Sequence, residues 1–326
     1  MDNQIIVLND DLRVESFAEE FAEIFNEAGI KYVVKTCVRE EDYIEFAKDS
    51  VIIFNQGTSK ITKKIIESLP KLKAIIRRGV GYDNIDIEAA RERGIIVCNT
   101  PGFCEEEVAT HAIALLLSFL RRIPHWHNWT HAGNWNKKNH AFTVEKPYAG
   151  MNTLEDENVG IIGFGLIGKN IYKKLLAFKV KFFIYDKYIK VDNSFKVEQV
   201  DLEELLKKCK YVILCCPLTD ETRHLIDEDS LRVMRKDSVI INVGKGALIN
   251  ENALIRCLIE KKIGGAALDV FEESPINKKN MLLKLDNVVI SPHLAGMSPK
   301  SMRRSFEIAL EDIVSIAKGQ TPILQD

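Results

Sequence analysis

The chain has 326 residues, of which 46% are hydrophobic and 28% are charged, the balance of an ordinary folded protein. Its 45 basic and 47 acidic side chains give a net charge of −2, so no global field attracts nucleic acid or an anionic membrane, and small-molecule partners are favoured. A chain of this length is longer than a single hydrophobic core usually accommodates, which predicts two domains.

The seven cysteines show no CxxC spacing, and several lie in apolar runs, as Cys215 and Cys216 do. They are expected to be reduced core residues of a cytoplasmic protein. Asp2 and the lack of a basic stretch before the first apolar run argue against a secretory signal. The longest strongly apolar segment, 112–120, is shorter than the ~20 residues of a membrane-spanning helix.

Short apolar runs alternate with helix-like stretches along the first hundred residues. In chain order the sequence predicts strand 5–8, helix 14–28, strand 32–36, helix 40–48, strand 51–54, strand 74–76 and strand 95–98. Strands that alternate with helices predict a parallel α/β sheet, so this part is expected to be a domain of its own.

A long helix is predicted next, at 105–121. Its run AIALLLSFL is apolar on nearly all faces, so we expect it to be buried within the chain or against a second copy in a homodimer. The segment 125–158, rich in Asn, Gly and Trp, is expected to be loop. Within it, His127 and His131 have the spacing of a helical metal site, but no nearby cysteine or carboxylate completes a set, so packing is favoured and no metal is predicted.

A glycine motif in the middle of the chain predicts a bound dinucleotide. Gly163, Gly165 and Gly168 follow the apolar run VGIIG and precede the amphipathic stretch KNIYKKLLAF, which gives the order strand, turn, helix. The first glycine permits the turn, the second lets the backbone approach a pyrophosphate, and the third allows close packing. The next apolar run ends at Asp186, near the expected spacing of a carboxylate that binds a ribose diol, which favours NAD over NADP. A glycine-rich turn without a ligand is the alternative.

Beyond the motif, the alternation of strands and helices resumes. Strands are predicted at 180–185, 211–215, 238–243, 265–269 and 287–290, and they complete a doubly wound sheet. The segment 299–318 has apolar residues at helical spacing, and we expect this last helix to return to the first domain.

Several segments together resemble the D-isomer-specific 2-hydroxyacid dehydrogenase family. They are RRGVGYDNID at 77–86, NTPG at 99–102, VATHAIALLL at 108–117, CPLTDETRHLI at 216–226, INVGKGALINENAL at 241–254, LDVFEESP at 268–275 and SPHLAGMS at 291–298. The resemblance covers most of the chain. It implies a flavodoxin-like substrate-binding domain (1–100 plus 295–326), a Rossmann NAD-binding domain (101–294) and an active site in the cleft between them.

The resemblance also implies which residues contact cofactor and substrate. The cofactor-binding set is Gly163, Gly165, Leu166, Ile167, Gly168, Asp186, Cys216, Pro217, Thr222, Val243, Gly244, Asp269, His293 and Gly296. The substrate-binding set is Gly79, Val80, Gly81, Lys245 and Gln56. Gln56 stands where the family often has an arginine, which disfavours a phosphorylated substrate.

Three catalytic positions are implied, and two of them depart from the family pattern. His293 is the expected acid/base. Lys245 replaces the arginine that grips the substrate carboxylate, so a point donor stands in place of a planar fork. Ser274 replaces the glutamate that orients and charges the histidine, unless the neighbouring Glu273 reaches over. Without a carboxylate partner, His293 loses a charge that favours its imidazolium form, and carbonyl reduction is expected to be faster in acid.

The leading hypothesis is an NAD-dependent oxidoreductase that transfers a hydride between nicotinamide and a 2-hydroxy or 2-oxo acid, with an atypical substrate or a reduced rate. The alternative is an NAD(H)-binding sensor or interaction protein with little catalysis, as the C-terminal-binding-protein corepressors partly are. NADH binding and NADH oxidation with 2-oxo acids distinguish the two.

Overall fold

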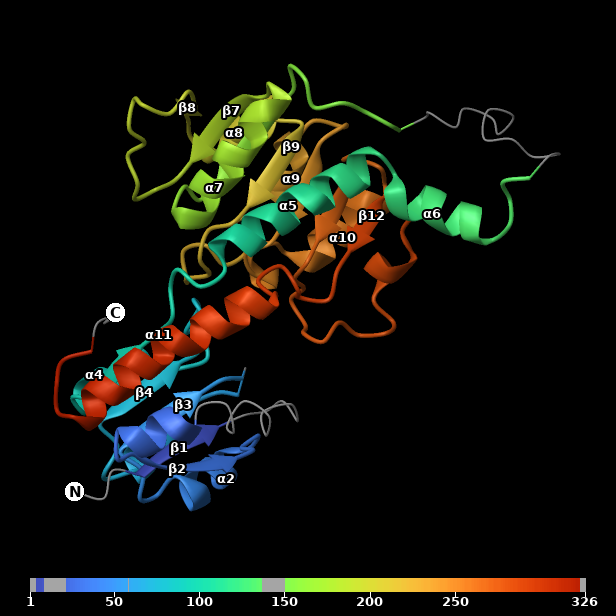
Figure 1. Cartoon of the computed structure of the whole chain (residues 1–326). Helices are drawn as coiled ribbons and strands as arrows, with labels where there is room; N and C mark the ends of the chain where they lie inside the picture. Colours follow the sequence, from blue (N-terminus) through green and yellow to red (C-terminus); the bar gives the residue numbers. More distant parts are fainter. Residues whose placement is uncertain (1–3, 9–21, 58, 137–149, 323–326) are drawn as a thin grey trace. The chain divides into compact units, whose positions relative to one another are not determined.

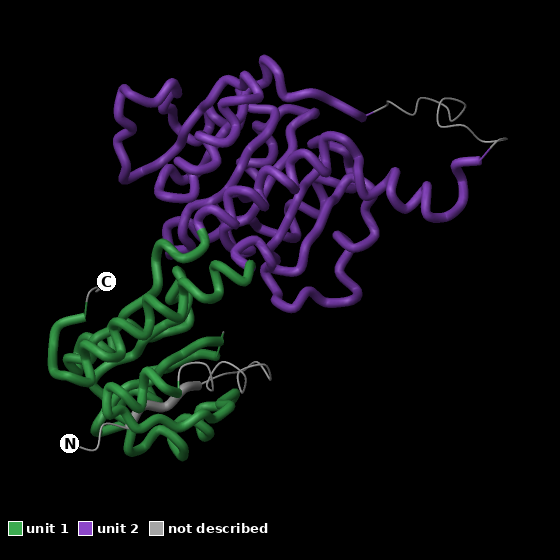
Figure 2. The backbone as a smooth tube through the Cα atoms, in the orientation of Figure 1, with its two compact units in different colours: residues 1–104, 298–326 green, residues 105–297 purple. Residues whose placement is uncertain are grey.

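A computed structural model of the chain (Figure 1) describes residues 4–8, 22–57, 59–136 and 150–322. The chain forms two compact units, the first from residues 1–104 and 298–326 and the second from residues 105–297 (Figure 2). The chain therefore crosses between the units twice. Part of the predicted helix 14–28 lies outside the described residues, and its described end is helical at 22–27.

The first unit contains a five-stranded sheet in which all strands are parallel. Across the sheet the order is β2 (Lys31–Lys35), β1 (Gln4–Leu8), β3 (Ile52–Asn55), β4 (Ala74–Arg77) and β5 (Ile96–Cys98). This 2-1-3-4-5 order is that of flavodoxin-like folds, as the resemblance implies. The predicted strands of this unit are confirmed.

Helices cover both faces of this sheet because successive strand residues point to opposite sides. Ile53 packs with residues of α2 (Glu40–Phe46), α3 (Lys63–Ser68) and α4 (Ile87–Glu92). Phe54 faces the other way and meets Phe306 of α11 (Pro299–Ala317), with ring centroids 5.7 Å apart. The last helix of the chain is therefore part of the first unit's core.

The second unit contains a seven-stranded sheet, again parallel throughout. Across the sheet the order is β12 (Val288–Ile290), β11 (Gly265–Leu268), β10 (Val239–Asn242), β9 (Tyr211–Leu214), β6 (Asn158–Ile162), β7 (Lys181–Tyr185) and β8 (Glu198–Gln199). Six of these strands follow the Rossmann order, and β12 extends the sheet by one. The predicted doubly wound sheet is confirmed, whereas the two-residue strand β8 was not predicted.

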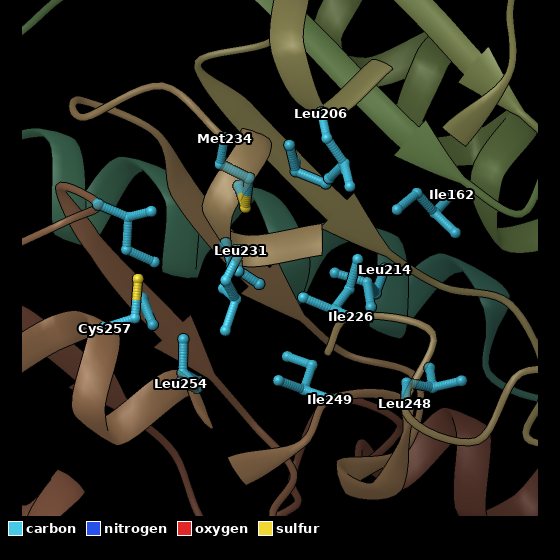
Figure 3. Packing of buried hydrophobic residues seen from close by; sticks show 14 of the residues in the cluster. Ile162, Leu206, Leu214, Ile226, Leu231, Met234, Leu248, Ile249, Leu254 and Cys257 are labelled. Atoms are coloured by element: carbon cyan, nitrogen blue, oxygen red, sulfur yellow. The ribbon is translucent and has the colours of Figure 1, made fainter. Parts of the chain in front are cut away.

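The helices of the second unit also lie on both faces of its sheet (Figure 1). On one face, α8 (Leu202–Lys208), α9 (Glu228–Val233) and α10 (Glu251–Ile259) supply Leu206, Leu231 and Leu254 to the core drawn in Figure 3. On the other face lie α5 (Glu105–Leu120) and α7 (Leu166–Leu175). A Cβ at Gly265 would come within 2.3 Å of the Phe119 ring, so the glycine lets α5 pack closely on the sheet.

The expectation of a loop from residue 125 onward is wrong for its first part, where α6 (Ile123–His131) forms. Arg122 adopts a left-handed conformation that ends the preceding helix, and Pro124 starts the new one in the first turn, where proline fits. Trp126 and Trp129 stack edge to face with centroids 5.6 Å apart. No residue of α6 is buried, and Figure 1 shows the helix continuing beyond the sheet. Among the described helices, none is long and apolar enough to cross a membrane.

Candidate active site and cofactor site

The predicted residues of the second unit gather at one edge of its sheet. They follow the carboxyl ends of β6, β7, β9, β10, β11 and β12, and in a parallel sheet these ends lie on the same side. Nucleotides bind such sheets where the strand order reverses, which here is between β6 and β9. Asp186 follows β7 on one side of this point, and Lys245 and His293 follow strands on the other side.

Glycine stands at the three positions of the motif for different physical reasons. A Cβ at Gly163, whose φ is +94°, would lie 2.7 Å from the backbone nitrogen of Cys216, and one at Gly168 would lie 2.2 Å from the carbonyl oxygen of Gly163. These two glycines are needed for packing. A Cβ at Gly165 would meet nothing within 4 Å, so the chain itself does not require a glycine there. The open space lies at the start of α7, where backbone N–H groups attract phosphate.

Asp186 ties the glycine turn to the loop after β7. One carboxylate oxygen accepts from the backbone N–H of Phe164 at 2.7 Å, and the other accepts from those of Tyr188 at 3.0 Å and Ile189 at 2.8 Å. A carboxylate has about four acceptor sites, so these bonds leave room for one more donor. The fixed negative charge beside the turn suits a ribose diol and disfavours a 2′-phosphate.

The loop after β9 borders the glycine turn. A Cβ at Gly163 would meet Cys216 first, and burial raises the pKa of the Cys216 thiol to about 12, so this thiol is not a nucleophile at neutral pH. The thiol of Cys215 donates to the carbonyl oxygen of Gly163 at 3.1 Å. The Thr222 hydroxyl donates to the Pro217 carbonyl at 2.8 Å and closes this loop. The predicted cofactor residue Cys216 therefore lies beside the glycine turn, and Pro217 follows it in the chain.

The turn that carries Lys245 is held by contacts that sequence reasoning missed. The buried Asn242 side chain donates to the Lys245 carbonyl at 2.9 Å and accepts from the Gly244 N–H at 3.0 Å. A Cβ at Gly246 would come within 1.9 Å of the Phe271 carbonyl group. The Lys245 turn is thus packed directly on the loop after β11 that leads to Ser274.

In that loop, Glu272 has its own partners. One carboxylate oxygen lies 2.5 Å from Nε2 of His224, and the other accepts from the backbone N–H of Glu251 at 3.1 Å. Glu272 therefore binds on the side of α10. Ser274 and Glu273 remain the candidates for the position beside His293, and both are exposed.

His293 follows β12 in an unusual backbone conformation, with φ at +56°. Its N–H donates to the carbonyl oxygen of Asp269 at 2.8 Å. The carboxylate of Asp269 accepts from the N–H groups of Leu294 at 2.9 Å and Ala295 at 2.8 Å. Asp269 is fully buried, so besides any contact with a cofactor it anchors the turn that presents His293.

In the first unit, the predicted substrate loop follows β4. Gly79 has a φ of +149°, its N–H donates to the Thr100 hydroxyl at 2.8 Å, and its carbonyl accepts from the Thr100 N–H at 3.0 Å. The Asn99 side chain donates to the Val80 carbonyl at 3.1 Å. Asn99 and Thr100 were not singled out as site residues, although they lie in the NTPG segment. Gly79 and Val80 are thereby tied to the NTPG segment, and Gly81 follows them in the same loop.

Gln56 follows β3 at the same sheet edge, and its role in the structure is to hold Arg78. Its Oε1 accepts from the Arg78 guanidinium at 2.7 Å, while its Nε2 is buried without a hydrogen-bond partner among the described residues. Arg78 also lies over the Phe306 ring, 4.4 Å from its centroid. A substrate contact of Gln56 stays a prediction.

Residues 113–295, more than half of the chain, match the family described as D-isomer specific 2-hydroxyacid dehydrogenase, NAD binding domain. The chain belongs to the D-isomer specific 2-hydroxyacid dehydrogenase family. The resemblance seen in the sequence is confirmed, and with it the fold class, NAD as cofactor and the class of NAD-dependent oxidoreductases.

Named relatives in this family differ in substrate. The chain is 39% identical over 267 residues to a glyoxylate reductase of Thermococcus litoralis, covering 81% of this chain and 80% of the relative. It is 38% identical over 305 residues to a D-3-phosphoglycerate dehydrogenase of Methanocaldococcus jannaschii, covering 93% of this chain but only 56% of that longer relative. Among solved structures, D-lactate dehydrogenase from Aquifex aeolicus, complexed with NAD and lactic acid, has a TM-score of 0.82 at 26% identity and covers 97% of this chain and 96% of its own.

Within this dehydrogenase, the two histidines considered for a metal site lie next to one another with their ring planes tilted by 47°. The rings of His127 and His131 lie 4.3 Å apart by their centroids on α6. In the described ranges, no group of three or more His, Cys, Asp or Glu side chains is arranged to hold a metal ion. The contact that the structure shows for these two side chains is the one between their own rings.

Proposed function

We propose that this dehydrogenase reduces a small, unphosphorylated 2-oxo acid with NADH, or oxidises the matching 2-hydroxy acid with NAD. The observation that carries the proposal is the arrangement at the edge of the second sheet. An open glycine turn and Asp186 lie on one side of the point where strand order reverses, and Lys245 and His293 lie on the other. A dinucleotide that crosses this point brings its nicotinamide to the side of His293.

The residues present fit NAD. Gly165 leaves room for a pyrophosphate at the start of α7, and Asp186 keeps an acceptor site for a ribose hydroxyl. When bound, NAD supplies hydride transfer at its nicotinamide ring. His293 holds the proton that the substrate oxygen gains, and Lys245 binds the carboxylate. Ser274 orients the imidazole by a hydrogen bond.

The first unit favours a substrate without a phosphate group. Gln56 stands where an arginine would grip a phosphate, and its oxygen is already bound to Arg78. Among the relatives, the glyoxylate reductase of Thermococcus litoralis has such a small substrate in its name. We expect kcat/KM for glyoxylate, pyruvate or hydroxypyruvate to be at least tenfold higher than for 3-phosphohydroxypyruvate. The reason is that Gln56 cannot supply the strong charge-assisted bond that an arginine would make to the phosphate.

The test is NADH oxidation across this panel of 2-oxo acids between pH 5 and 8. Since the proton donor is an imidazolium, the rate of reduction should rise as the pH falls through the range in which imidazoles titrate. Rapid turnover that is independent of pH across this range would contradict the role of His293 as the proton donor.

The replacements at 245 and 274 favour a second candidate, an NAD(H)-binding sensor or interaction protein with little catalysis. Lysine lacks the planar fork of arginine, and serine lacks the charge of glutamate, so both changes weaken the usual catalytic set. Calorimetric binding of NADH together with no turnover of any 2-oxo acid in the panel would select this candidate.

We also propose a homodimer formed through α5 and α6. None of the residues of α6 is buried, and the apolar side chains of Ile123, at its start, and Trp135, shortly after its end, are 56% and 62% exposed. Light scattering should give twice the monomer mass, and Ile123→Asp should lower it, because a charge buried at an interface without a partner is costly. A cytoplasmic location stays a prediction.

A further inference from the structure

Three side chains from distant parts of the second unit form one hydrogen-bonded chain behind the His293 turn. Nε2 of His111, on α5, lies 2.8 Å from Oγ of Ser291, which follows β12. Oγ of Ser291 donates to Oδ1 of Asp269 at 2.6 Å, and Nε2 of His111 lies 3.3 Å from the same carboxylate oxygen. None of the proposed steps in catalysis uses His111 or Ser291.

The order of donors in this chain fixes the tautomer of His111. A hydroxyl has one hydrogen, and that of Ser291 points to Asp269. The Ser291 oxygen must then accept from His111, so Nε2 of His111 carries a proton. The result is a directed chain from imidazole to hydroxyl to carboxylate, in which each bond polarises the next.

Asp269 needs these donors because it is fully buried. A buried carboxylate is stable only where its oxygens are hydrogen-bonded. Two of its donors are the backbone N–H groups of Leu294 and Ala295, in the turn that carries His293. The side chains of Ser291 and His111 complete the set from the other side, so they determine how the carboxylate is oriented toward that turn.

The backbone of His293 requires such support. Its φ of +56° is a left-handed conformation, which residues other than glycine adopt only where the surrounding structure holds it. Its N–H is bound to the Asp269 carbonyl at 2.8 Å, and the next two N–H groups are bound to the Asp269 carboxylate. The side chain of His293 therefore points where Asp269 directs it.

We propose that His111 and Ser291 are positioning residues for His293 and act on it through the carboxylate of Asp269. The inference rests on the proposed function in one respect, namely that His293 is the proton donor. Its geometric part, the support of the His293 turn, is independent of the reaction.

The test compares disruptive, conservative and control variants in the full chain. Ser291→Ala and His111→Leu remove the donors, whereas Ser291→Thr keeps the hydroxyl and His111→Gln keeps an N–H donor. Ser238→Ala is the matched control, because the Ser238 hydroxyl is also buried and donates to the Cys209 carbonyl at 3.0 Å, but it precedes β10 at the opposite edge of the sheet.

We expect Ser291→Ala and His111→Leu to lower kcat for 2-oxo acid reduction by about 10- to 100-fold, because misplacement of a catalytic group by ~1 Å has effects of this order. The dissociation constant of NADH should change less than about threefold, since the glycine turn and Asp186 are untouched. Ser291→Thr and His111→Gln should recover most of kcat, and Ser238→Ala should keep it. The NMR signal of the His293 ring, assigned with His293→Gln, should shift in the two disruptive variants only.

An unchanged kcat and an unchanged His293 signal in Ser291→Ala would overturn the proposal. So would an equal loss of kcat in Ser238→Ala, because the effect would then follow from lost stability alone. If the parent protein turned over no 2-oxo acid, the proposed function would fail. The ring signal of His293 would still decide the positioning role, since a shift in Ser291→Ala but not in Ser238→Ala supports it and no shift refutes it.

Discussion

The cofactor site is best tested by a pair of substitutions within the glycine motif. Gly165 has φ −73° and ψ −152°, which alanine also adopts, and its added Cβ would meet no atom within 4 Å. Gly165→Ala should therefore fold with a free energy of unfolding within about 1 kcal/mol of the parent, the size of the change expected at a helix N-cap. At Gly168 the same methyl group would lie 2.2 Å from the Gly163 carbonyl oxygen. Gly168→Ala should be destabilised by about 1–3 kcal/mol, the usual cost of overpacking.

NADH binding should reverse the order of the two variants: Gly165→Ala, the milder change in stability, should be the one that binds NADH weakly. The Gly165 methyl group occupies the space through which the backbone approaches a pyrophosphate, so calorimetry should show NADH binding weakened at least tenfold, or ~1.4 kcal/mol. A thermal melt supplies the stability control, at ~2–4 °C for each kcal/mol in a unit of this size. If Gly165→Ala bound NADH as tightly as the parent, the pyrophosphate would not lie at the start of α7, and the assignment of the cofactor to this turn would be wrong.

Two further predictions concern the substituted catalytic positions and the choice of cofactor. Lys245→Arg combined with Ser274→Glu should raise kcat/KM on glyoxylate or pyruvate by about tenfold or more, because the pair restores a planar guanidinium for the substrate carboxylate and a carboxylate for His293. Steady-state assays measure this change. A loss of activity would instead mean that the two residues are specialised for another acid. Glu221 accepts from Lys187 at 2.7 Å and from the Tyr188 hydroxyl, and these bonds, with Lys187 first, hold the pKa of its carboxyl below the usual range. Glu221→Gln should free the positive charge of Lys187, next to Asp186, to attract the 2′-phosphate of NADPH. Binding of NADPH relative to NADH should improve by about two- to fivefold, a modest effect because the Lys187–Glu221 pair is exposed. Competition binding measures the ratio, and an unchanged ratio would show that Glu221 has no role in cofactor selection.

Much of the fold follows from the sequence because apolar runs separated by turns specify buried parallel strands. The topology adds what the runs alone do not show, namely that Lys245, Ser274 and His293 follow neighbouring strands β10, β11 and β12. α6 escaped prediction because its aromatic and histidine side chains show no apolar periodicity and none of its residues is buried. Its start depends on a left-handed Arg122, which no local pattern signals.

The support of the site was harder to predict than its members. His111, Asp269 and Ser291 are separated by up to 180 residues in the chain and meet only after the sheet has formed. Asn242 appears in the sequence as the end of a strand, although its side chain closes the Lys245 turn. Side chains that bind backbone groups of other elements leave no spacing rule in the sequence, so they emerge only from the structure.

The loop after β11 determines what the two substituted positions can do together. Gly246 packs so closely on the Phe271 carbonyl group that the Lys245 turn and this loop are in direct contact. Glu272 is bound to His224 and to the backbone of Glu251, so a shift that would bring it toward His293 would break both contacts. Within this loop, position 274 and Glu273 are left as the places from which a charge could act on His293. Because Lys245 and Ser274 lie on segments in direct contact, the changes in activation free energy caused by Lys245→Arg and Ser274→Glu singly should not add up to the change caused by the pair. A double-mutant cycle measures this coupling and reports how closely the two positions cooperate.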